Sequence, residues 1–288
     1  MSSLLLFHKI AEFSAPTRIG IFITTLLLVW APLAIPIYLL VEDVNLESIW
    51  AITLLYIEFI ILVRLWGKEV YQQPHLLHWY GLIINRRNLQ LFLQGLVISL
   101  CSLFSLFILE TFFGWVIWQS PSEKLLQFIL EGLFVSIGIG FAEELLFRGW
   151  LLDELERNYE PKVVLWASSI VYAVLHFIKP IEEILQTWLQ FPGLVLLGLI
   201  CVWAKRSSEI QFNQFSNKKQ ELLGLPIGIH AGLVWGYYIV NVDGLVKYYD
   251  EVAEWLVGID GNPLTGVMGL LFLGAIALWV RRSLLLKI

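Results

Sequence analysis

Two adjacent glutamates and an arginine lie within a long apolar stretch of the sequence. Glu143, Glu144 and Arg148 interrupt the run from Leu125 to Trp150, which is long enough to cross a bilayer and contains only one other charged residue, Glu131. Charged side chains in such a segment are costly, so they are usually paired and functional. Glu144 and Arg148 are four residues apart and can pair on one helix face. Glu143 points about 100° away from Glu144, so we expect its partner on another helix.

Two histidines within other apolar runs are the candidate partners. His176 lies near the end of one run, and His230 lies mid-way along a later one. A carboxylate beside imidazole can activate water, and a second imidazole can donate to the oxyanion of a tetrahedral intermediate. The same three side chains could instead hold a divalent metal with water as the fourth ligand. The sequence leaves both mechanisms open: the first, which we favour, requires no cofactor, and only the second needs a metal.

These residue types also have purely structural interpretations. A single intramembrane histidine often serves as a hydrogen-bonding strut between helices, and Glu144 with Arg148 could simply fix helix packing. Glu58, within the second apolar run, is expected to make a packing hydrogen bond. Cys101 and Cys201 both lie in apolar runs and are expected to be small buried hydrophobic residues without a disulfide.

The composition is that of an integral membrane protein. Hydrophobic residues make up 58% of the chain and charged residues only 15%, with a mean hydropathy of +0.74. Soluble domains carry about 25% charged residues. The net charge of −5 is spread over the loops, and no basic stripe with interleaved aromatics predicts a nucleic-acid partner. No polar stretch is long enough for a separate soluble domain, so we expect a single membrane domain over residues 1–288.

The apolar runs predict an all-α polytopic fold of about eight transmembrane helices enclosing a polar cavity. Residues 1–18 are expected to form a short amphipathic segment at the membrane interface. The expected spans cover residues 19–41, 48–66, 90–118, 125–151, 162–178, 193–204, 222–241 and 264–280.

Lysine and arginine predict the orientation of these spans. One set of loops, which includes both termini, holds fifteen of the basic residues, whereas the opposite set holds three. Cytoplasmic loops carry the excess of positive charge, so both termini should be cytoplasmic, and we expect a multi-pass protein of a bacterial cell membrane. One difficulty follows from this topology. His176 would lie roughly 20 Å into its span at helical rise and Glu143 only about half as deep, so their pairing requires the fifth span to be tilted or to begin deeper.

The order of these motifs resembles that of the CPBP intramembrane proteases, also called the CAAX-protease and bacteriocin-processing or ABI family. Type II CAAX prenyl endopeptidases are its best-known branch. The family pattern is EExxxR on one span, an aromatic residue four positions before a histidine on the next, and HxxxN or a close variant on a later span. Here the resemblance covers about residues 125–241, and its motifs are Glu143-Glu144-xxx-Arg148, Tyr172-xxx-His176 and His230.

This resemblance implies a glutamate-dependent intramembrane endopeptidase. Glu143 would activate water together with His176, and His230 would help to form the oxyanion site. Glu144 and Arg148 would be structural partners or would position the substrate. The implied partners are membrane lipid and a peptide or a prenylated or membrane-tethered protein. The resemblance predicts neither an oligomeric state nor a particular substrate.

One position departs from the family pattern and keeps other functions open. Val234 stands four residues after His230, where the family has asparagine, and valine cannot donate a hydrogen bond. This departure motivates the alternative of a non-catalytic membrane scaffold or immunity protein with the same fold. Transport is a third alternative, motivated by the intramembrane charges alone, but the sequence shows no internal repeat of the kind found in many transporters.

Overall fold

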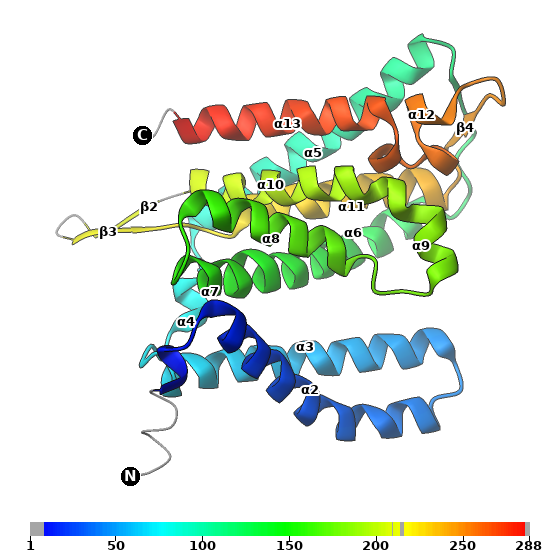
Figure 1. Cartoon of the computed structure of the whole chain (residues 1–288). Coiled ribbons are helices and arrows are strands. Elements are labelled where there is room, and N and C mark those ends of the chain that lie inside the picture. Colours follow the sequence, from blue (N-terminus) through cyan, green and yellow to red (C-terminus); the bar gives the residue numbers. More distant parts are fainter. Residues whose placement is uncertain (1–8, 209, 214–215, 286–288) are drawn as a thin grey trace.

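The chain folds into a bundle of long helices with a two-stranded antiparallel sheet at each end (Figure 1). The computed structural model describes residues 9–208, 210–213 and 216–285. The α-helices are α2 (Ala15–Leu40), α3 (Val44–Glu69), α4 (Leu76–Trp79), α5 (Arg86–Phe112), α6 (Leu125–Glu144), α7 (Leu152–Glu156), α8 (Pro161–Leu175), α9 (Ile181–Thr187), α10 (Phe191–Ser207), α11 (Gly224–Val242), α12 (Glu254–Val257) and α13 (Val267–Leu285). The strands are β1 (Val116–Trp118), β2 (Ile210–Asn213), β3 (Ser216–Gln220) and β4 (Val246–Tyr248). Four short non-α helices are η1 (Leu145–Leu151), η2 (Trp188–Gln190), η3 (Ile259–Gly261) and η4 (Pro263–Thr265).

The predicted all-α polytopic membrane fold is confirmed, but the expected count of eight spans is not. Within the described residues, seven helical segments are long and apolar enough to cross a membrane. The fifth expected span, 162–178, is the shorter helix α8 of 15 residues, which ends at Leu175. Pro180 follows closely, and proline disfavours the helical conformation of the residue before it. The short expected span 193–204 belongs to a longer segment, Ile181–Ser207.

Three smaller expectations concern the end of the third span, the N-terminal segment and the two cysteines. The expected span 90–118 is wrong at its end, because α5 stops at Phe112 and residues 116–118 form strand β1. Gly114, with φ of +72°, provides the left-handed turn between them. Residues 1–8 of the expected amphipathic segment lie outside the described residues. Cys201 is buried as expected, whereas Cys101 is exposed, because its side of α5 faces away from the bundle.

Close packing of α11 between α5 and α6 sets the centre of the bundle. A Cβ added to Gly228 of α11 would lie 2.0 Å from the carbonyl oxygen of Phe92 on α5, so only glycine permits this approach. On the other side, a Cβ added to Gly140 of α6 would lie 3.1 Å from the backbone nitrogen of Ala231. These small residues bring His230 next to the end of α6.

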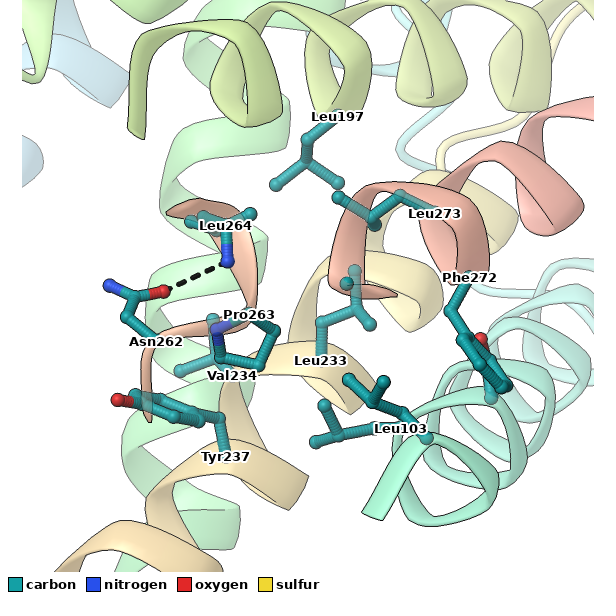
Figure 2. Close-up of a pocket in the computed structure, with 13 residues that line it drawn as sticks. Leu103, Leu197, Leu233, Val234, Tyr237, Asn262, Pro263, Leu264, Phe272 and Leu273 are labelled. Atoms are coloured by element: carbon teal, nitrogen blue, oxygen red, sulfur yellow. Dashed lines mark hydrogen bonds between the residues drawn. The ribbon is translucent and has the colours of Figure 1, made fainter. Parts of the chain in front are cut away.

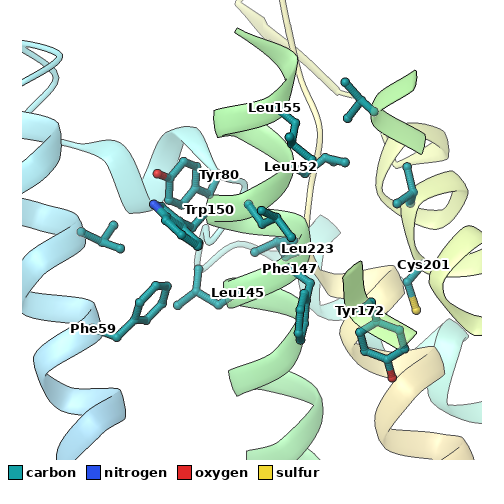
Figure 3. Close-up of a cluster of buried hydrophobic side chains, with 14 of the residues drawn as sticks. Phe59, Tyr80, Leu145, Phe147, Trp150, Leu152, Leu155, Tyr172, Cys201 and Leu223 are labelled. Carbon is teal, nitrogen blue, oxygen red and sulfur yellow. The ribbon is translucent and has the colours of Figure 1, made fainter. Parts of the chain in front are cut away.

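An apolar cluster holds η1 in place beside α3 and α8. Figure 3 shows Phe59 of α3 facing Trp150 and Leu145 of η1, with Tyr172 of α8 on the far side next to Phe147. The rings of Phe59 and Trp150 lie 6.1 Å apart edge to face, and those of Phe147 and Tyr172 lie 5.0 Å apart edge to face. Such aromatic pairs contribute about 0.5–1.5 kcal/mol beyond the burial of their area.

A buried polar network ties the start of α2 to α7. Arg18 Nε donates to Glu154 at 2.8 Å and its guanidinium also reaches the Asn158 side chain at 2.9 Å. The Tyr71 hydroxyl donates to the same Glu154 carboxylate at 2.6 Å. Burial and then the Glu154 charge raise the pKa of Tyr71, so its hydroxyl stays a neutral donor. The network anchors the α2–α3 hairpin at the end of the bundle where the described chain begins and ends (Figure 1).

Candidate active site

Three side chains from three helices converge on one carboxylate oxygen. Glu143 is the penultimate residue of α6, His176 follows the last residue of α8, and His230 lies in the middle of α11. Glu143 Oε2 is 3.7 Å from His176 Nε2 and 3.7 Å from His230 Nε2. These separations exceed a direct hydrogen bond. Glu143 Oε2 is buried and has no hydrogen-bond partner among the described residues, so an acceptor is left unsatisfied between the two rings.

The hydrogen bonds of the other ring nitrogens assign the tautomers of both histidines. His176 Nδ1 lies 2.8 Å from the carbonyl oxygen of Tyr172, which can only accept, so Nδ1 carries the proton. His230 Nδ1 lies 2.9 Å from Glu144 Oε1 and donates to that carboxylate. In their neutral forms both rings therefore present an unprotonated Nε2 to Glu143. A molecule between them must donate protons, as water does.

Glu144 is bound at the centre of a closed network. Its Oε1 accepts from Arg148 at 3.0 Å as well as from His230, and all three side chains are almost completely buried. Arg148 continues the network by donating to the Gly198 carbonyl on α10 at 3.2 Å. The sequence predicted the Glu144–Arg148 pair, and the structure has it. The bond from His230 to Glu144, which makes Glu144 the orienting partner of a site residue, was not predicted.

A π-helical segment follows directly after the two glutamates. In η1 (Leu145–Leu151) each turn contains an additional residue, and such segments are frequent at functional sites. Within this segment, the carbonyl oxygen of Arg148 accepts a hydrogen bond from Lys205 Nζ at 2.7 Å. Lys205 was one of the fifteen basic residues counted with the loops, but it is only 5% exposed and lies inside the bundle.

The same continuation removes the expected difference in depth between Glu143 and His176. The fourth span does not end near residue 151 but continues through η1 and α7 to Glu156. Glu143 therefore lies 13 residues before that end (143 to 156), and His176 lies 15 residues after the start of α8 at Pro161 (161 to 176). At helical rise these depths are both about 20 Å. No tilt of the fifth helix is required.

The site is open on one side. The side chains of Glu143 and His176 are 28% and 30% exposed, whereas that of His230 is 4% exposed. Tyr56 of α3 lies next to this opening, because its hydroxyl donates to the Ala142 carbonyl at 3.2 Å. No role was assigned to Tyr56 from the sequence. The hydrogen bond expected of Glu58 itself is absent among the described residues, although its carboxylate is buried.

Val234 lies one turn beyond His230 and contributes to an apolar pocket. Figure 2 shows Val234 beside Tyr237, Asn262 and Pro263, with Leu233 and Leu103 to the right of them. The pocket has a volume of about 160 Å³ and is formed by α5, α10, α11, η4 and α13. The Asn262 side chain accepts from the backbone of Leu264 at 3.0 Å. The position at which the resemblance leads one to expect asparagine is therefore part of an apolar wall.

The metal alternative finds no additional support in the geometry. Among the described residues, no group of three or more His, Cys, Asp or Glu side chains is spaced to hold a metal ion. We therefore derive no step through a metal, and metal assistance stays a prediction. The polar cavity expected around the site also stays a prediction.

Comparison with known proteins identifies the central part of the chain. Residues 124–236 match the family described as Rce1-like, type II CAAX prenyl endopeptidase. This segment is a CAAX-protease family domain. It contains α6 to α10 and most of α11, and thus all the residues that converge at the candidate site as well as Val234.

Curated proteins add one relative at lower coverage. A stretch of 75 residues is 36% identical to the uncharacterized protein YpbD of Bacillus subtilis (strain 168). The match covers 25% of this chain and 33% of that protein, so the chain spans about a third of the relative. No solved structure matches the chain significantly. The long apolar helices make this an integral membrane protein, and its central segment matches a protease family.

Proposed function

We propose that the CAAX-protease domain is an intramembrane endopeptidase that hydrolyses one peptide bond of a membrane-tethered or prenylated peptide. The observation that carries the proposal is the position of Glu143 Oε2, at 3.7 Å from the Nε2 atoms of both His176 and His230. A water molecule can lie about 2.8 Å from each of these atoms. It would donate one proton to Glu143 Oε2 and the other to His176 Nε2, and turn a lone pair towards a carbonyl carbon.

Glu143 acts as the general base in this mechanism. It takes a proton as the water oxygen attacks the carbonyl carbon, and His176, fixed by its bond to the Tyr172 carbonyl, orients the water. The proton then passes to the leaving nitrogen and the carbon–nitrogen bond breaks, which releases a carboxylic acid and an amine; proton exchange between these products gives the carboxylate and the ammonium ion. His230 can donate to the oxyanion only after its Nε2 gains a proton, and its bond to Glu144 places a compensating negative charge beside it.

The proposed orientation of the chain indicates from which side of the membrane a substrate would reach the site. We place the loops with fifteen basic residues in the cytoplasm, and the partly exposed side chains of Glu143 and His176 mark the open side of the site. A tethered peptide would enter there from the cytoplasmic leaflet. Tyr56, at the edge of this opening, would contact it.

Cleavage of a quenched, lipidated peptide by the purified protein tests the proposal. Wild type should cleave, and Glu143→Ala and His176→Ala should each lose cleavage by at least about 10²-fold, the usual contribution of a general acid or base. Cleavage measured with and without a chelator distinguishes water activation by Glu143 alone from metal-assisted activation. Without a metal, the cleavage rate should not change when the chelator is added. If both variants cleave as well as wild type, the proposed endopeptidase mechanism is wrong.

The apolar setting of Val234 favours one rival function, a non-catalytic scaffold or immunity protein. Such a protein would use the fold to bind a partner, and Glu143 would be dispensable. A pull-down that recovers a stable partner equally with wild type and Glu143→Ala, without any cleavage by wild type, would favour this rival. Reproducible wild-type proteolysis would exclude it.

A further inference from the structure

A second cavity lies where the elbow between α3 and α5 meets α6, outside the candidate active site. Its volume is about 670 Å³, within the usual range of small-molecule sites. The elbow includes α4 and connects two membrane-spanning helices at the end of the bundle that carries the basic loops (Figure 1). The described residues that line the cavity are Arg64, Pro74, His75, Leu77, His78, Leu82, Ile84 and Phe141.

The lining divides into a polar, basic part and an apolar part. Arg64, His75 and His78 supply nitrogen donors, and the described lining contains no carboxylate. Leu77, Leu82, Ile84 and Phe141 supply hydrocarbon, and Ile84 is completely exposed at 105% of its reference area. A cation beside exposed hydrocarbon at a membrane interface complements an anionic amphiphile.

The elbow is held in one conformation by direct contacts. Gly67 of α3 accepts from the backbone of Gln73 at 2.7 Å, and a Cβ at Gly67 would lie 2.6 Å from Leu76, so the elbow packs tightly on the end of α3. The Trp79 indole donates to Asp153 of α7 at 2.9 Å. The cavity is therefore preformed, and a ligand need not order its walls.

We propose that this cavity binds an anionic phospholipid. The phosphate would accept from the Arg64 guanidinium and the His75 ring, and the first part of an acyl chain would lie along Leu82, Ile84 and Phe141. Arginine suits this task because its planar fork matches phosphate oxygens in pairs. A phospholipid explains both parts of the lining, whereas a free phosphate ion would use only the basic part.

Lipid binding in this cavity does not depend on peptide cleavage, although the cavity adjoins the candidate site. Phe141 lies two residues before Glu143 on α6, and its ring lies 6.2 Å from that of Tyr56, edge to face. A lipid seated against Phe141 would support the contact of α3 with α6. The experiment therefore measures lipid binding directly, in wild type and in Glu143→Ala, so its failure would leave the proposed protease mechanism untouched.

Native mass spectrometry of the full chain tests the proposal by titration with dioleoyl phosphatidylglycerol and, separately, dioleoyl phosphatidylcholine. Wild type and Glu143→Ala should bind the anionic lipid about tenfold more tightly than the zwitterionic one, and Arg64→Gln combined with His75→Gln should remove this preference. Lys68→Gln is the matched control, since Lys68 lies one turn along α3, is exposed and does not line the cavity. It should change the affinity by less than about twofold.

Three outcomes would overturn the proposal. In the first, the double variant binds phosphatidylglycerol as tightly as wild type does. In the second, wild type binds the two lipids equally well. Alternatively, millimolar inorganic phosphate could displace the lipid completely, and Ile84→Ser could leave lipid affinity unchanged, which would identify a free-anion site without an acyl component. Thermal unfolding of each variant confirms that the compared proteins are folded.

Discussion

Two carboxylate networks of this bundle differ in how completely they are closed. At the start of α2, Glu154 receives direct hydrogen bonds of 2.6–2.9 Å from Tyr71 and Arg18, and Arg18 and Glu154 are 2% and 1% exposed. At the end of α6, Glu143 is 28% exposed, and Oε2 lies 3.7 Å from two rings without accepting a direct hydrogen bond from a described residue. The first network fixes helices relative to each other. The second leaves a buried carboxylate oxygen without a hydrogen-bond partner among the described residues.

The two adjacent glutamates of the motif differ from each other in the same way as these two networks do. Glu144 is completely buried and accepts from Arg148 and His230, so it resembles Glu154 rather than its own neighbour. The difference between residues 143 and 144 is the rotation of about 100° between successive helix positions. One motif thus supplies both the carboxylate that faces two histidine rings and the buried pair that orients one of those rings.

The largest expected effect is the loss of cleavage in Glu143→Gln without loss of stability. The amide keeps the shape of the side chain but cannot take a proton, so cleavage should fall by about 10³–10⁴-fold. Because Glu143 makes no direct hydrogen bond through Oε2, the melting temperature should stay close to that of wild type. A rate assay and a thermal unfolding curve on the same preparation measure both. A variant that loses stability instead would place Glu143 with Glu154 as a structural residue.

Arg18→Met should show the opposite pattern. Removing the guanidinium leaves the Glu154 carboxylate buried without its charge partner, and breaking a buried pair in this way costs about 3–5 kcal/mol of unfolding free energy. The folded fraction should still cleave at a rate close to that of wild type, because the network is remote from the candidate site. Denaturant unfolding with a cleavage assay normalised to folded protein tests this. Full stability with lost cleavage would contradict the comparison.

His176→Gln tests whether Glu143 and His176 act on the same water. The single variant should lose about 10²-fold in cleavage, because it removes the group that orients the water. Combined with Glu143→Gln, it should cause no further loss, since residues that act as one unit are strongly non-additive. Single-turnover kinetics of the two single variants and the double variant give the comparison. Losses that multiply would mean that the two side chains act separately.

The sequence predicted the membrane fold and indicated the candidate site residues because both inferences depend on residue type. Apolar runs indicate membrane helices whatever their partners are, and Glu143, Glu144 and Arg148 stand out against them. The similar depths of Glu143 and His176, by contrast, follow from the continuation of the span through a π-helical segment to Glu156, which the residue pattern did not predict. The sequence alone placed the end of this span too early.

Other features escaped prediction because they depend on contacts between distant segments. The bond from His230 to Glu144 joins residues 86 positions apart, and Arg18 meets Glu154 across 136 positions. Lys205 was counted with the loops, yet its amine reaches the Arg148 carbonyl inside the bundle. Hydropathy describes the preference of each helix for lipid, but not the face on which each polar group meets its partner.

Val234→Asn is expected to have the smallest effect, and it tests where the boundary of the site lies. An amide placed in the apolar pocket with Leu103 and Leu233 should cost about 1–2 kcal/mol of unfolding free energy. Cleavage should change by less than tenfold, because the pocket lies one turn of α11 beyond His230. Val234→Thr, which has almost the same shape, serves as the control for polarity without an amide donor. A gain in cleavage of tenfold or more with Asn but not with Thr would show that residue 234 belongs to the candidate active site. The apolar wall would then be part of the oxyanion site.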